Sequence, residues 1–540
     1  MTSTPTAGIL RQFNDAGFVG PVRLLTRREC RSLMSYLDSR DRPTAAEWPK
    51  GAAVTDWLLY RLAANPRLIE LVKLILGEDV VLWGCSIVKR GPKEIHPWHV
   101  DIETSASDGR CVSVWIGLEN TKRNGALELI AGSHAVDKVV QQIQWERGYR
   151  RGEATTEAVL GWARERNGAA ALAKPQMDDG DALLFDGRLW HGSRNLRRSG
   201  TRTALLLQFA SADTPISMHD ETALEWPFPP ALKPPVIVLH GGVTDADTNR
   251  LVRPPSRAKG SAMLETCVMP LDLPLEEQPG GGWKSYQLFG GATPVVDNMN
   301  CHASVLSAGE TPHPPHGHRE EELLIVLDGE AELLTADRPS ADGARVERAG
   351  PGAIAYYPAF QNHAIRNPGP GPVTYVMFKW RVNDEKAPSD QIPANLFRCP
   401  DARSNEVDGW VTQRVMEGPT GWLGQLHCHV SDLAPGAGYE PHVDAYDVAI
   451  VTLSGRIETL GREVVPNGVI YYAAGEKHGM RNIGDKPARY LVFEFHPSAI
   501  DVGQHLKRRL PLAAKQMLKR TALAVGVDLR QLRERLSSRI

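Results

Sequence analysis

The chain has 540 residues, of which 42% are hydrophobic and 23% are charged. These values are close to the average for folded globular proteins, and they exclude a largely disordered chain, a collagen-like chain and a long coiled coil. The length exceeds what one hydrophobic core usually serves, so we expect about three or four domains. Glycine and proline together make about 16% of the residues, above the usual ~12%, which favours mainly β domains with many tight turns.

The formal net charge of -2 gives no field that would attract the protein to nucleic acid, so we expect no nucleic-acid partner. The charge is nevertheless uneven, because residues 507–540 contain ten Lys or Arg and only two acidic residues. Leucines recur among these basic residues and predict a short helical C-terminal tail over 501–540. Such a helix could contact a membrane surface or a partner, or it could pack on the acidic body of the protein.

The first residues contain no apolar run of the length that a signal peptide needs, and no stretch of about 18 apolar residues occurs. We therefore expect a cytoplasmic protein. The seven cysteines are scattered and never spaced as Cys-x-x-Cys, which favours buried thiols over a disulfide framework or a zinc site.

The first secondary-structure signal along the chain is Thr26 followed by Glu29, the pattern of a helix capping box. Apolar residues at helical spacing follow it, and further helical sequence covers 57–76. Alternating apolar residues over 112–118 and 203–209 then predict strands of a half-buried sheet. We place the first domain at residues 1–230.

Residues 231–282 are rich in proline and glycine, which predicts a linker or wrapping arm with little regular structure. Beyond this segment an internal repeat begins. Residues 316–329 align without gaps on residues 442–455, and His363 corresponds to His478. We therefore predict two copies of one domain, at 283–385 and 386–500. Each copy has a glycine at the expected hairpin turn, Gly329 or Gly455.

The first domain contains His99-Val100-Asp101. On a strand, residues two apart point to the same face. With a second histidine from another strand, these two side chains would form a 2-His-1-carboxylate triad that leaves three positions of an iron ion open. His-x-Asp alone is a weak signal, because chance gives about one such pattern in a chain of this composition.

Later sequence blocks supply the context. Trp98 to Asp101, the block Val114-Trp115-Ile116-Gly117-Leu118 with Asn124 to His134, and the block from His191 to Arg202 occur in an order and spacing that resemble the phytanoyl-CoA dioxygenase family of iron(II)- and 2-oxoglutarate-dependent oxygenases. The resemblance covers about residues 9 to 215.

The resemblance implies specific roles. His99, Asp101 and His191 would bind Fe(II), while Arg202 and Ser193 would hold the distal carboxylate of 2-oxoglutarate. A guanidinium suits this task because it binds a carboxylate with two hydrogen bonds and stays charged. Trp115 is a further candidate for the cosubstrate pocket. We leave His96 and His134 as structural or substrate-side residues.

In the first repeat, His316, His318 and Glu322 are followed at a distance by His363. This spacing resembles both motifs of the cupin superfamily, a small jelly-roll β-barrel, and the resemblance places the four residues on its usual metal ligands. The set would accept one of several divalent metals of unknown identity. The alternative is a metal-free barrel. Glu320 and Glu321 are expected to be a solvated edge.

The second repeat keeps His442 and His478 but has Asp444 and Val448 at the other two ligand positions. Such a site is either degenerate and metal-free or an altered triad of His442, Asp444 and His478. His427 and His429 flank Cys428, and we interpret them as alternating strand residues beside a core cysteine.

The predicted architecture is therefore mainly β: a double-stranded β-helix (jelly-roll) oxygenase domain with flanking helices, two cupin β-barrels and a short helical C-terminal tail. The favoured function is an oxygenase that uses Fe(II), 2-oxoglutarate and O2 to hydroxylate a C–H bond of a small-molecule or carrier-linked substrate. The cupins would assist substrate binding or assembly, including assembly of a homo-oligomer. Two alternatives stay open: metal-dependent isomerase or dioxygenase chemistry in the first cupin, and a bicupin that senses a ligand without catalysis.

Overall fold

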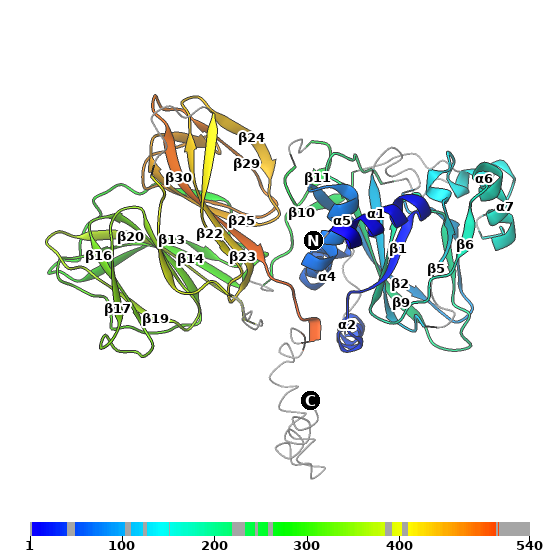
Figure 1. The fold of residues 1–540 in the computed structure, drawn as a ribbon, viewed down its shortest axis with the longest axis horizontal. Helices are drawn as coiled ribbons and strands as arrows, with labels where there is room; N and C mark the ends of the chain where they lie inside the picture. Colours follow the sequence, from blue (N-terminus) through cyan, green and yellow to red (C-terminus); the bar gives the residue numbers. More distant parts are fainter. Residues whose placement is uncertain are drawn as a thin grey trace, which may run out of the picture.

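The computed structural model describes residues 3–39, 49–102, 110–122, 127–150, 152–218, 233–243, 247–257, 263–383, 391–401, 409–503 and 506. The predicted basic tail, from residue 507 onward, lies outside the described residues. Figure 1 shows two lobes, one formed by the amino-terminal domain and the other by the two repeats. No helix in the described ranges combines the length and the apolar character that crossing a lipid bilayer requires.

The amino-terminal lobe consists of two sheets with helices at their edges and on one face. Its helices are α1 (Ser3–Ala16), α2 (Arg27–Asp38), α3 (Ala52–Thr55), α4 (Trp57–Ala63), α5 (Pro66–Leu76), the 3-10 helix η1 (Ser133–Ala135), α6 (Val140–Glu146) and α7 (Thr156–Arg166). Its strands are β1 (Phe18–Arg23), β2 (Val80–Arg90), β3 (Ile95–His99), β4 (Cys111–Glu119), β5 (Leu127–Ala131), β6 (Ala171–Ala173), β7 (Asp181–Asp186), β8 (His191–Arg194), β9 (Arg202–Ser211), β10 (Pro235–His240) and β11 (Arg250–Leu251). The larger sheet has the order β1-β7-β4-β9-β2-β10-β11, and the smaller has the order β3-β8-β5-β6.

The predicted capping box is confirmed. The Thr26 side chain accepts a hydrogen bond from the Glu29 amide, and the Glu29 carboxylate accepts one from the Thr26 amide, so α2 begins at Arg27. The prediction that the sheet is half-buried is wrong, because β4 is buried along its whole length except at Glu119. Helices α2 and α5 pack on this strand from one side, and the other face lies inside the lobe.

The segment 231–282 forms more regular structure than its composition predicts. Strand β10 pairs antiparallel with β2 and extends the larger sheet. Its apolar residues, Val236 to Leu239, are buried, and Pro235 stands at the first strand position, where a missing amide hydrogen is tolerated. Further on, β12 (Cys267–Met269) pairs with a strand of the second repeat. The segment therefore belongs to two sheets.

Each repeat consists of two facing sheets. The first contains β13 (Trp283–Gly291), β14 (Asn298–Leu306), β15 (Glu321–Asp328), β16 (Ala331–Ala336), β17 (Arg345–Ala349), β18 (Ala353–Tyr357), β19 (Asn362–Arg366) and β20 (Val373–Arg381), followed by β21 (Asn395–Arg398). The second contains β22 (Trp410–Gly418), β23 (Leu423–Leu433), β24 (Gly438–Val443), β25 (Asp447–Ser454), β26 (Ile457–Thr459), β27 (Arg462–Val464), β28 (Val469–Tyr472), β29 (Lys477–Asn482) and β30 (Ala488–Pro497). The sheet orders are β13-β14-β20-β15-β18-β21 with β17-β16-β19, and β12-β28-β25-β30-β23-β22 with β24-β29-β26-β27.

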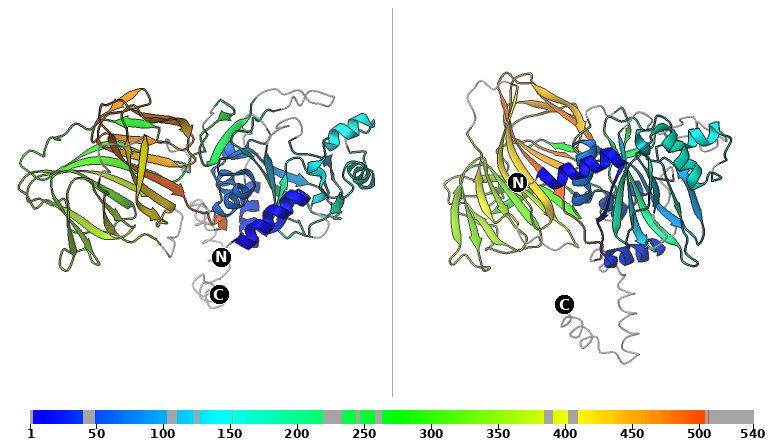
Figure 2. Two further views of the ribbon diagram at one scale, coloured as in Figure 1. Left: turned by 45° about the horizontal axis from the view of Figure 1, so that its top comes forward. Right: turned by 45° about the vertical axis from the view of Figure 1, so that its right-hand side comes forward.

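The repeats exchange edge strands. Strand β12 precedes the first repeat in the chain but pairs with β28 of the second. Strand β21 lies at the start of the range 386–500 predicted for the second repeat but pairs with β18 of the first. Each exchanged strand covers an edge that would otherwise expose unpaired amides and carbonyls, and the exchange links the two repeats into one unit, which Figures 1 and 2 show as a single lobe.

The turns at Gly329 and Gly455 adopt the positive φ of 81° that their glycines permit. The predicted hairpins are nevertheless wrong. Strands β15 and β16 lie in different sheets of the first repeat, and β25 and β26 lie in different sheets of the second. These turns carry the chain from one sheet to the other.

A shared core joins the two repeats. Phe378 of the first contacts Phe493 of the second, with ring centroids 5.9 Å apart, and Trp380 contacts Phe495 at 5.3 Å.

Glu321 lies fully buried in this region, so the expectation of a solvated edge is wrong for this residue. Its carboxylate accepts hydrogen bonds from four donors: the Tyr356 hydroxyl, the Trp380 indole, the Thr420 hydroxyl and the Gly421 amide. Burial raises the pKa of Glu321 to about 7. Glu320 is half-buried and pairs with Arg381.

The repeat lobe contacts the amino-terminal lobe through both of its halves. The Trp57 indole of α4 donates a hydrogen bond to the Pro294 carbonyl of the first repeat at 3.1 Å. The Val243 amide, which follows β10, donates to the Val443 carbonyl of the second repeat at 3.3 Å. Val443 packs in the same hydrophobic cluster as core residues of the amino-terminal lobe. In Figure 1, α4 lies on the side of the larger sheet that faces the repeats.

Candidate active site and metal centres

The first candidate site lies between the two sheets of the amino-terminal lobe. His99 ends β3, and His191 begins the neighbouring strand β8, where the two residues are direct cross-strand partners. Asp101 follows two residues after His99, and its amide donates to the Gly187 carbonyl. The local fold thus brings three residues together that are up to 92 positions apart in the printed sequence.

The three side chains converge. Oδ1 of Asp101 lies 3.5 Å from Nε2 of His99 and 3.6 Å from Nε2 of His191. Nδ1 of His99 lies 2.8 Å from the Pro97 carbonyl, and Nδ1 of His191 lies 2.9 Å from the Leu189 carbonyl. Because each Nδ1–H donates to a carbonyl, each Nε2 presents its lone pair toward the common centre.

The electrostatics of this cluster suit a cation. Burial would raise the pKa of the Asp101 carboxyl, but His191 and His99 beside it lower that pKa well below its usual range. Burial and the neighbouring His191 lower the pKa of His99, which keeps its imidazole neutral. The Ser113 hydroxyl donates to the second oxygen of Asp101 and fixes the orientation of the carboxylate. Two imidazoles whose Nε2 atoms face the centre and one ionised carboxylate fit an Fe(II) ion with open coordination positions.

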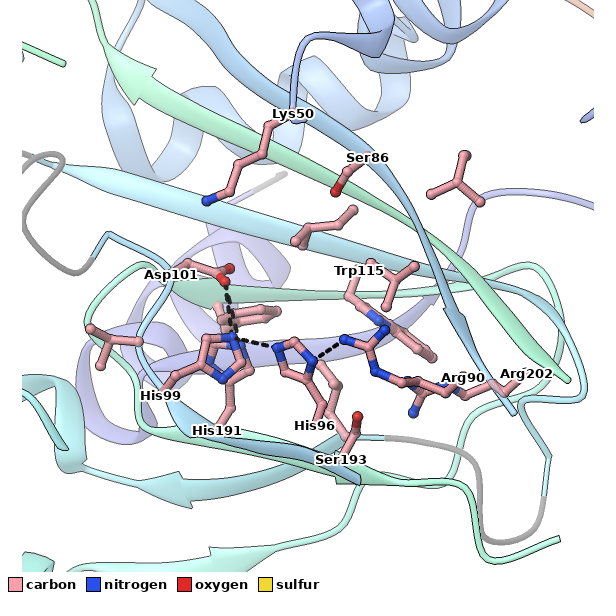
Figure 3. A pocket seen from close by; sticks show the side chains of 16 residues that line it. Lys50, Ser86, Arg90, His96, His99, Asp101, Trp115, His191, Ser193 and Arg202 are labelled. Carbon is pink, nitrogen blue, oxygen red and sulfur yellow. Dashed lines mark hydrogen bonds and ion pairs between the residues drawn. The ribbon is translucent and has the colours of Figure 1, made fainter. Parts of the chain in front are cut away.

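A cavity of about 520 Å³ opens from the triad. Its polar lining includes Lys50, Ser86, Arg90, His96, Ser193 and Arg202 in addition to the triad. Figure 3 shows the triad at one end, a row formed by His96 and Arg90 beside it, and Trp115 with Arg202 beyond. The cavity therefore joins the metal ligands to several cationic side chains.

The three residues expected to hold 2-oxoglutarate all line this cavity. Arg202 begins β9, its side chain is fully buried, and its guanidinium carbon lies 5.5 Å from the centroid of the Trp115 ring. Burial lowers the pKa of Arg202 to about 10, so the side chain stays charged at neutral pH. Ser193 lies on β8, two residues after His191 and on the same face of the strand.

The cavity also contains His96, which was expected to be structural or substrate-side, and Arg90, for which the sequence predicted no role. Nε2 of His96 lies 3.2 Å from Nε2 of His99, and Arg90 donates to Nδ1 of His96. Burial lowers the pKa of His96 to about 2, so its ring is neutral, and the contact with Arg90 leaves the proton on Nε2. Strand alternation could have indicated Arg90, because it shares one face of β2 with Ser86 and Val88. His134, by contrast, contacts the Asn14 carbonyl at 3.0 Å and is structural.

In the first repeat, three of the four expected ligands come together. Oε2 of Glu322 lies 3.2 Å from Nε2 of His318, and Oε1 lies 3.4 Å from Nε2 of His363. His316 stands beside this group, with its ring centroid 5.4 Å from that of His318, but it does not join the three residues whose ligand atoms lie within 4.8 Å of one another.

Gly317, which separates His316 from His318, packs closely against the turn at Phe360. A Cβ at this position would lie 2.6 Å from the Phe360 carbonyl oxygen. Phe360 adopts a left-handed φ of 66° and is 65% exposed. Its amide donates to the His318 carbonyl at 2.6 Å, so this strained turn holds the loop that carries the candidate ligand His318.

Lys379 is a further member of the first-repeat site. It is the cross-strand partner of Glu322, and its ammonium lies 3.0 Å from Oε2 of that carboxylate. Burial would raise the pKa of Glu322, but His363, His318 and Lys379 lower it well below the usual range. The Lys379 ammonium therefore forms an ion pair with the carboxylate that a metal ion in this site would need as a ligand.

The second repeat brings His442, Asp444 and His478 within 4.8 Å of one another. A separate group, His427, His429 and Glu494, meets the same distance limit. His427 and His429 alternate with the buried Cys428 on β23 as predicted, and Glu494 faces them from β30.

Comparison with known proteins gives two family matches. Residues 13–204 match the model described as Phytanoyl-CoA dioxygenase, and residues 304–379 match the model described as Cupin domain. The peroxisomal phytanoyl-CoA dioxygenase of Homo sapiens is 24% identical over 164 residues, which are 29% of this chain and 46% of that protein. The ectoine dioxygenase of Sphingopyxis alaskensis is 31% identical over 155 residues, which are 25% of this chain and 48% of that protein. The chain thus spans about half the length of these curated relatives.

Among solved structures, a cupin 2 conserved barrel domain protein from Leptotrichia buccalis is 12% identical, with a TM-score of 0.29, and the match covers 41% of this chain and 92% of that one. The family matches coincide with the two kinds of two-sheet domain described above. Residues 13–204 form a domain of the phytanoyl-CoA dioxygenase family, and residues 304–379 lie in a cupin domain of the same chain.

Proposed function

We propose that the amino-terminal domain is an Fe(II)- and 2-oxoglutarate-dependent oxygenase that hydroxylates a C–H bond of a small-molecule or carrier-linked substrate. The observation that carries the proposal is the cavity in which His99, Asp101 and His191 converge beside a buried Arg202. Relatives at 24% and 31% identity are named as dioxygenases, which supports the general kind of reaction.

Residues at the two ends of the cavity would have different roles, one end binding the metal and the other the distal carboxylate of 2-oxoglutarate. His99, Asp101 and His191 would hold the iron, which together with 2-oxoglutarate and O2 supplies the oxidising power and leaves succinate and CO2. Arg202 would bind the distal carboxylate of 2-oxoglutarate through two parallel hydrogen bonds, and the Ser193 hydroxyl would donate to the same group. The Trp115 ring packs against the guanidinium and restricts its motion.

His96 and Arg90 would orient the ligands beside the metal. The Nε2–H of His96 points toward the triad, where it can donate a hydrogen bond to an oxygen of bound cosubstrate or substrate. Lys50 and Ser86 line the side of the cavity away from Arg202 (Figure 3) and would contact the substrate. The described residues that line the cavity include three cationic side chains, Lys50, Arg90 and Arg202, and one carboxylate, Asp101. The cavity therefore favours anionic ligands.

The test is turnover of 2-oxoglutarate by the full chain. Purified protein supplied with Fe(II), O2 and a panel of candidate substrates should convert 2-oxoglutarate to succinate. Hydroxylated product should form in equal amount with the correct substrate. Failure to form succinate with any substrate, by protein shown to bind Fe(II), would contradict the proposal.

A second candidate function is metal-dependent chemistry in the first cupin repeat. The convergence of His318, Glu322 and His363 favours it. If this repeat transforms the product of the oxygenase, His363→Ala should cause a hydroxylated intermediate to accumulate, whereas His191→Ala should stop the reaction before any intermediate forms. If His363→Ala leaves the products unchanged, the repeats serve assembly and substrate binding, a role consistent with their contacts to the amino-terminal lobe.

A further inference from the structure

The second repeat contains a triad that matches the amino-terminal site more closely than it matches the first repeat. Both have the sequence His-Val-Asp, at 99–101 and at 442–444, with a second histidine from a neighbouring strand. Oδ2 of Asp444 lies 3.5 Å from Nε2 of His442 and 3.3 Å from Nε2 of His478. The corresponding distances in the amino-terminal site are 3.5 and 3.6 Å.

The imidazoles of this triad are oriented for metal binding. Nδ1 of His442 lies 3.2 Å from the Glu440 carbonyl, and Nδ1 of His478 lies 3.0 Å from the Glu476 carbonyl. As in the amino-terminal site, the carbonyl belongs to the residue two positions before the histidine, and each Nε2 faces the carboxylate. His442 and His478 are cross-strand partners on β24 and β29, which fixes their separation.

The second repeat has a carboxylate in its candidate site, but at a different position of the motif from the carboxylate of the first repeat. In the first repeat it comes from Glu322 on β15, and the equivalent residue of β25 is Val448. Asp444 supplies it in the second repeat, from the position that His318 holds in the first. Both repeats thus bring together two imidazoles and one carboxylate, and the second does so with the shorter side chain.

The charges around the two carboxylates differ in sign. The cross-strand partner of Glu322 is Lys379, which forms an ion pair with it. The cross-strand partner of Val448 is Glu494, which lines the same cavity as Asp444. Within the described part of the chain, the recorded ion pairs of Asp444 are those with His442 and His478. The strand position that carries an ammonium in the first repeat thus carries a carboxylate in the second, which removes the cation that would compete with a metal ion.

The cavity around this triad is small and aromatic. Its volume is about 160 Å³, less than a third of the amino-terminal cavity. Tyr439, Tyr446, Tyr472 and Tyr490 contribute to its lining, and the described residues that line it include neither Arg nor Lys. The site therefore lacks the cationic group that would bind the distal carboxylate of 2-oxoglutarate.

The other cluster in this repeat is less suited to a metal. Nδ1 of His427 lies 2.8 Å from the Glu417 carboxylate, and Glu494 forms an ion pair with His496 at 3.0 Å. Two of its three members are thus already engaged with groups outside the cluster, whereas the members of the triad pair with one another.

We infer that the second cupin repeat binds a divalent first-row transition metal through His442, Asp444 and His478. The ion keeps open coordination positions for water or a small ligand that is not a dicarboxylate. This site is independent of the proposed oxygenase reaction. The ligand motifs suggest that the first repeat is the better metal site, because its motif is complete. The structure favours the second repeat instead, because no ammonium pairs with its carboxylate among the described residues.

The experiment uses the full chain with His191→Ala and His363→Ala, which disable the other two candidate sites. The protein is stripped with a chelator and titrated with Co(II), whose visible absorption reports coordination. We expect one equivalent of Co(II) to bind, and we expect binding to be lost when Asp444→Ala or Asp444→Asn is added. His427→Ala is the matched control, because it removes a histidine of the neighbouring cluster, and it should leave the titration unchanged.

Three outcomes would overturn the inference. The first is failure of the two-site variant to bind Co(II) while its thermal unfolding matches that of the unmodified chain. The second is loss of binding on His427→Ala but not on the Asp444 variants. The third, a change of the cobalt spectrum on addition of 2-oxoglutarate, would contradict the exclusion of dicarboxylates. Thermal unfolding of each metal-free variant shows whether a lost signal reflects a lost ligand or a lost fold, and His442→Ala provides an independent removal of a ligand.

Discussion

The amino-terminal site and the first-repeat site contain the same three ligand types at similar distances, but they differ in what borders the carboxylate. Asp101 accepts a hydrogen bond from the neutral Ser113 hydroxyl, whereas Glu322 forms an ion pair with the Lys379 ammonium at 3.0 Å. The cationic Arg202 lies in the amino-terminal cavity near Trp115. A ligand motif therefore defines which atoms could bind a metal ion. The neighbouring charges determine whether a side chain pairs with those atoms instead.

The largest expected effect separates the two sites by function. His191→Ala should reduce conversion of 2-oxoglutarate to succinate by about three orders of magnitude or more, because the metal centre supplies several kcal/mol of catalysis. His363→Ala should leave this conversion within about twofold. The measurement is succinate formation by the full chain. Comparable losses in both variants would show that the two sites act together, and His134→Ala serves as a control for a histidine with a structural contact.

Arg202→Ala tests the assignment of the cosubstrate subsite. Loss of a charge-assisted pair of hydrogen bonds should raise the KM for 2-oxoglutarate by about 10- to 100-fold, with a smaller effect on the KM for substrate. Arg202→Lys should recover only part of the affinity, since an ammonium does not reproduce the planar fork. The exposed Arg198 provides the control. An unchanged KM in Arg202→Ala would place the cosubstrate elsewhere.

Lys379→Met tests the difference in charge directly. Removing the ammonium from Glu322 should raise the metal affinity of the first repeat by about tenfold or more, as measured by metal titration of the chain that carries His191→Ala and Asp444→Ala. The matched control is Arg381→Met on the same strand, since Arg381 pairs with Glu320. If both variants leave the affinity unchanged, the ammonium does not compete with the metal.

The smallest expected effect concerns the loop that carries His318. Phe360→Gly should stabilise the protein by about 0.5–1 kcal/mol, because glycine relieves the left-handed strain while this exposed ring contributes little burial. Denaturant unfolding measures the change. Phe360→Ala keeps the β-carbon and should give no such gain, so equal effects of the two variants would argue that strain is not the cause.

Local patterns predicted much of this protein. The capping box before α2 depends on residues three apart, the His-Val-Asp motif places two candidate ligands on one face by strand alternation, and the repeat is visible as gap-free blocks, offset by 126 residues at 316–329 and by 115 at His363. These features rest on neighbouring residues, whose relative positions backbone geometry fixes. The mainly β fold was expected from strand alternation and from the glycine and proline content, whereas the convergence of His99 and Asp101 with His191 was expected from the resemblance to the phytanoyl-CoA dioxygenase family.

Tertiary structure decided what depends on distant strands. Strand alternation predicts that the adjacent residues Glu321 and Glu322 point to opposite faces of β15, but it does not show which groups each one meets. Glu321 meets four donors in the shared core, whereas Glu322 meets Lys379 and two histidines. The exchange of β12 and β21, the exclusion of His316 from the ligand group and the contact between Arg90 and His96 have the same origin. Cross-strand register and sheet packing bring together residues far apart in the chain, and one residue of register places a side chain on the opposite face. The low net charge, which averages an acidic body with a basic end of the chain, likewise hid the local balance of ammonium and carboxylate groups that distinguishes one metal site from the next.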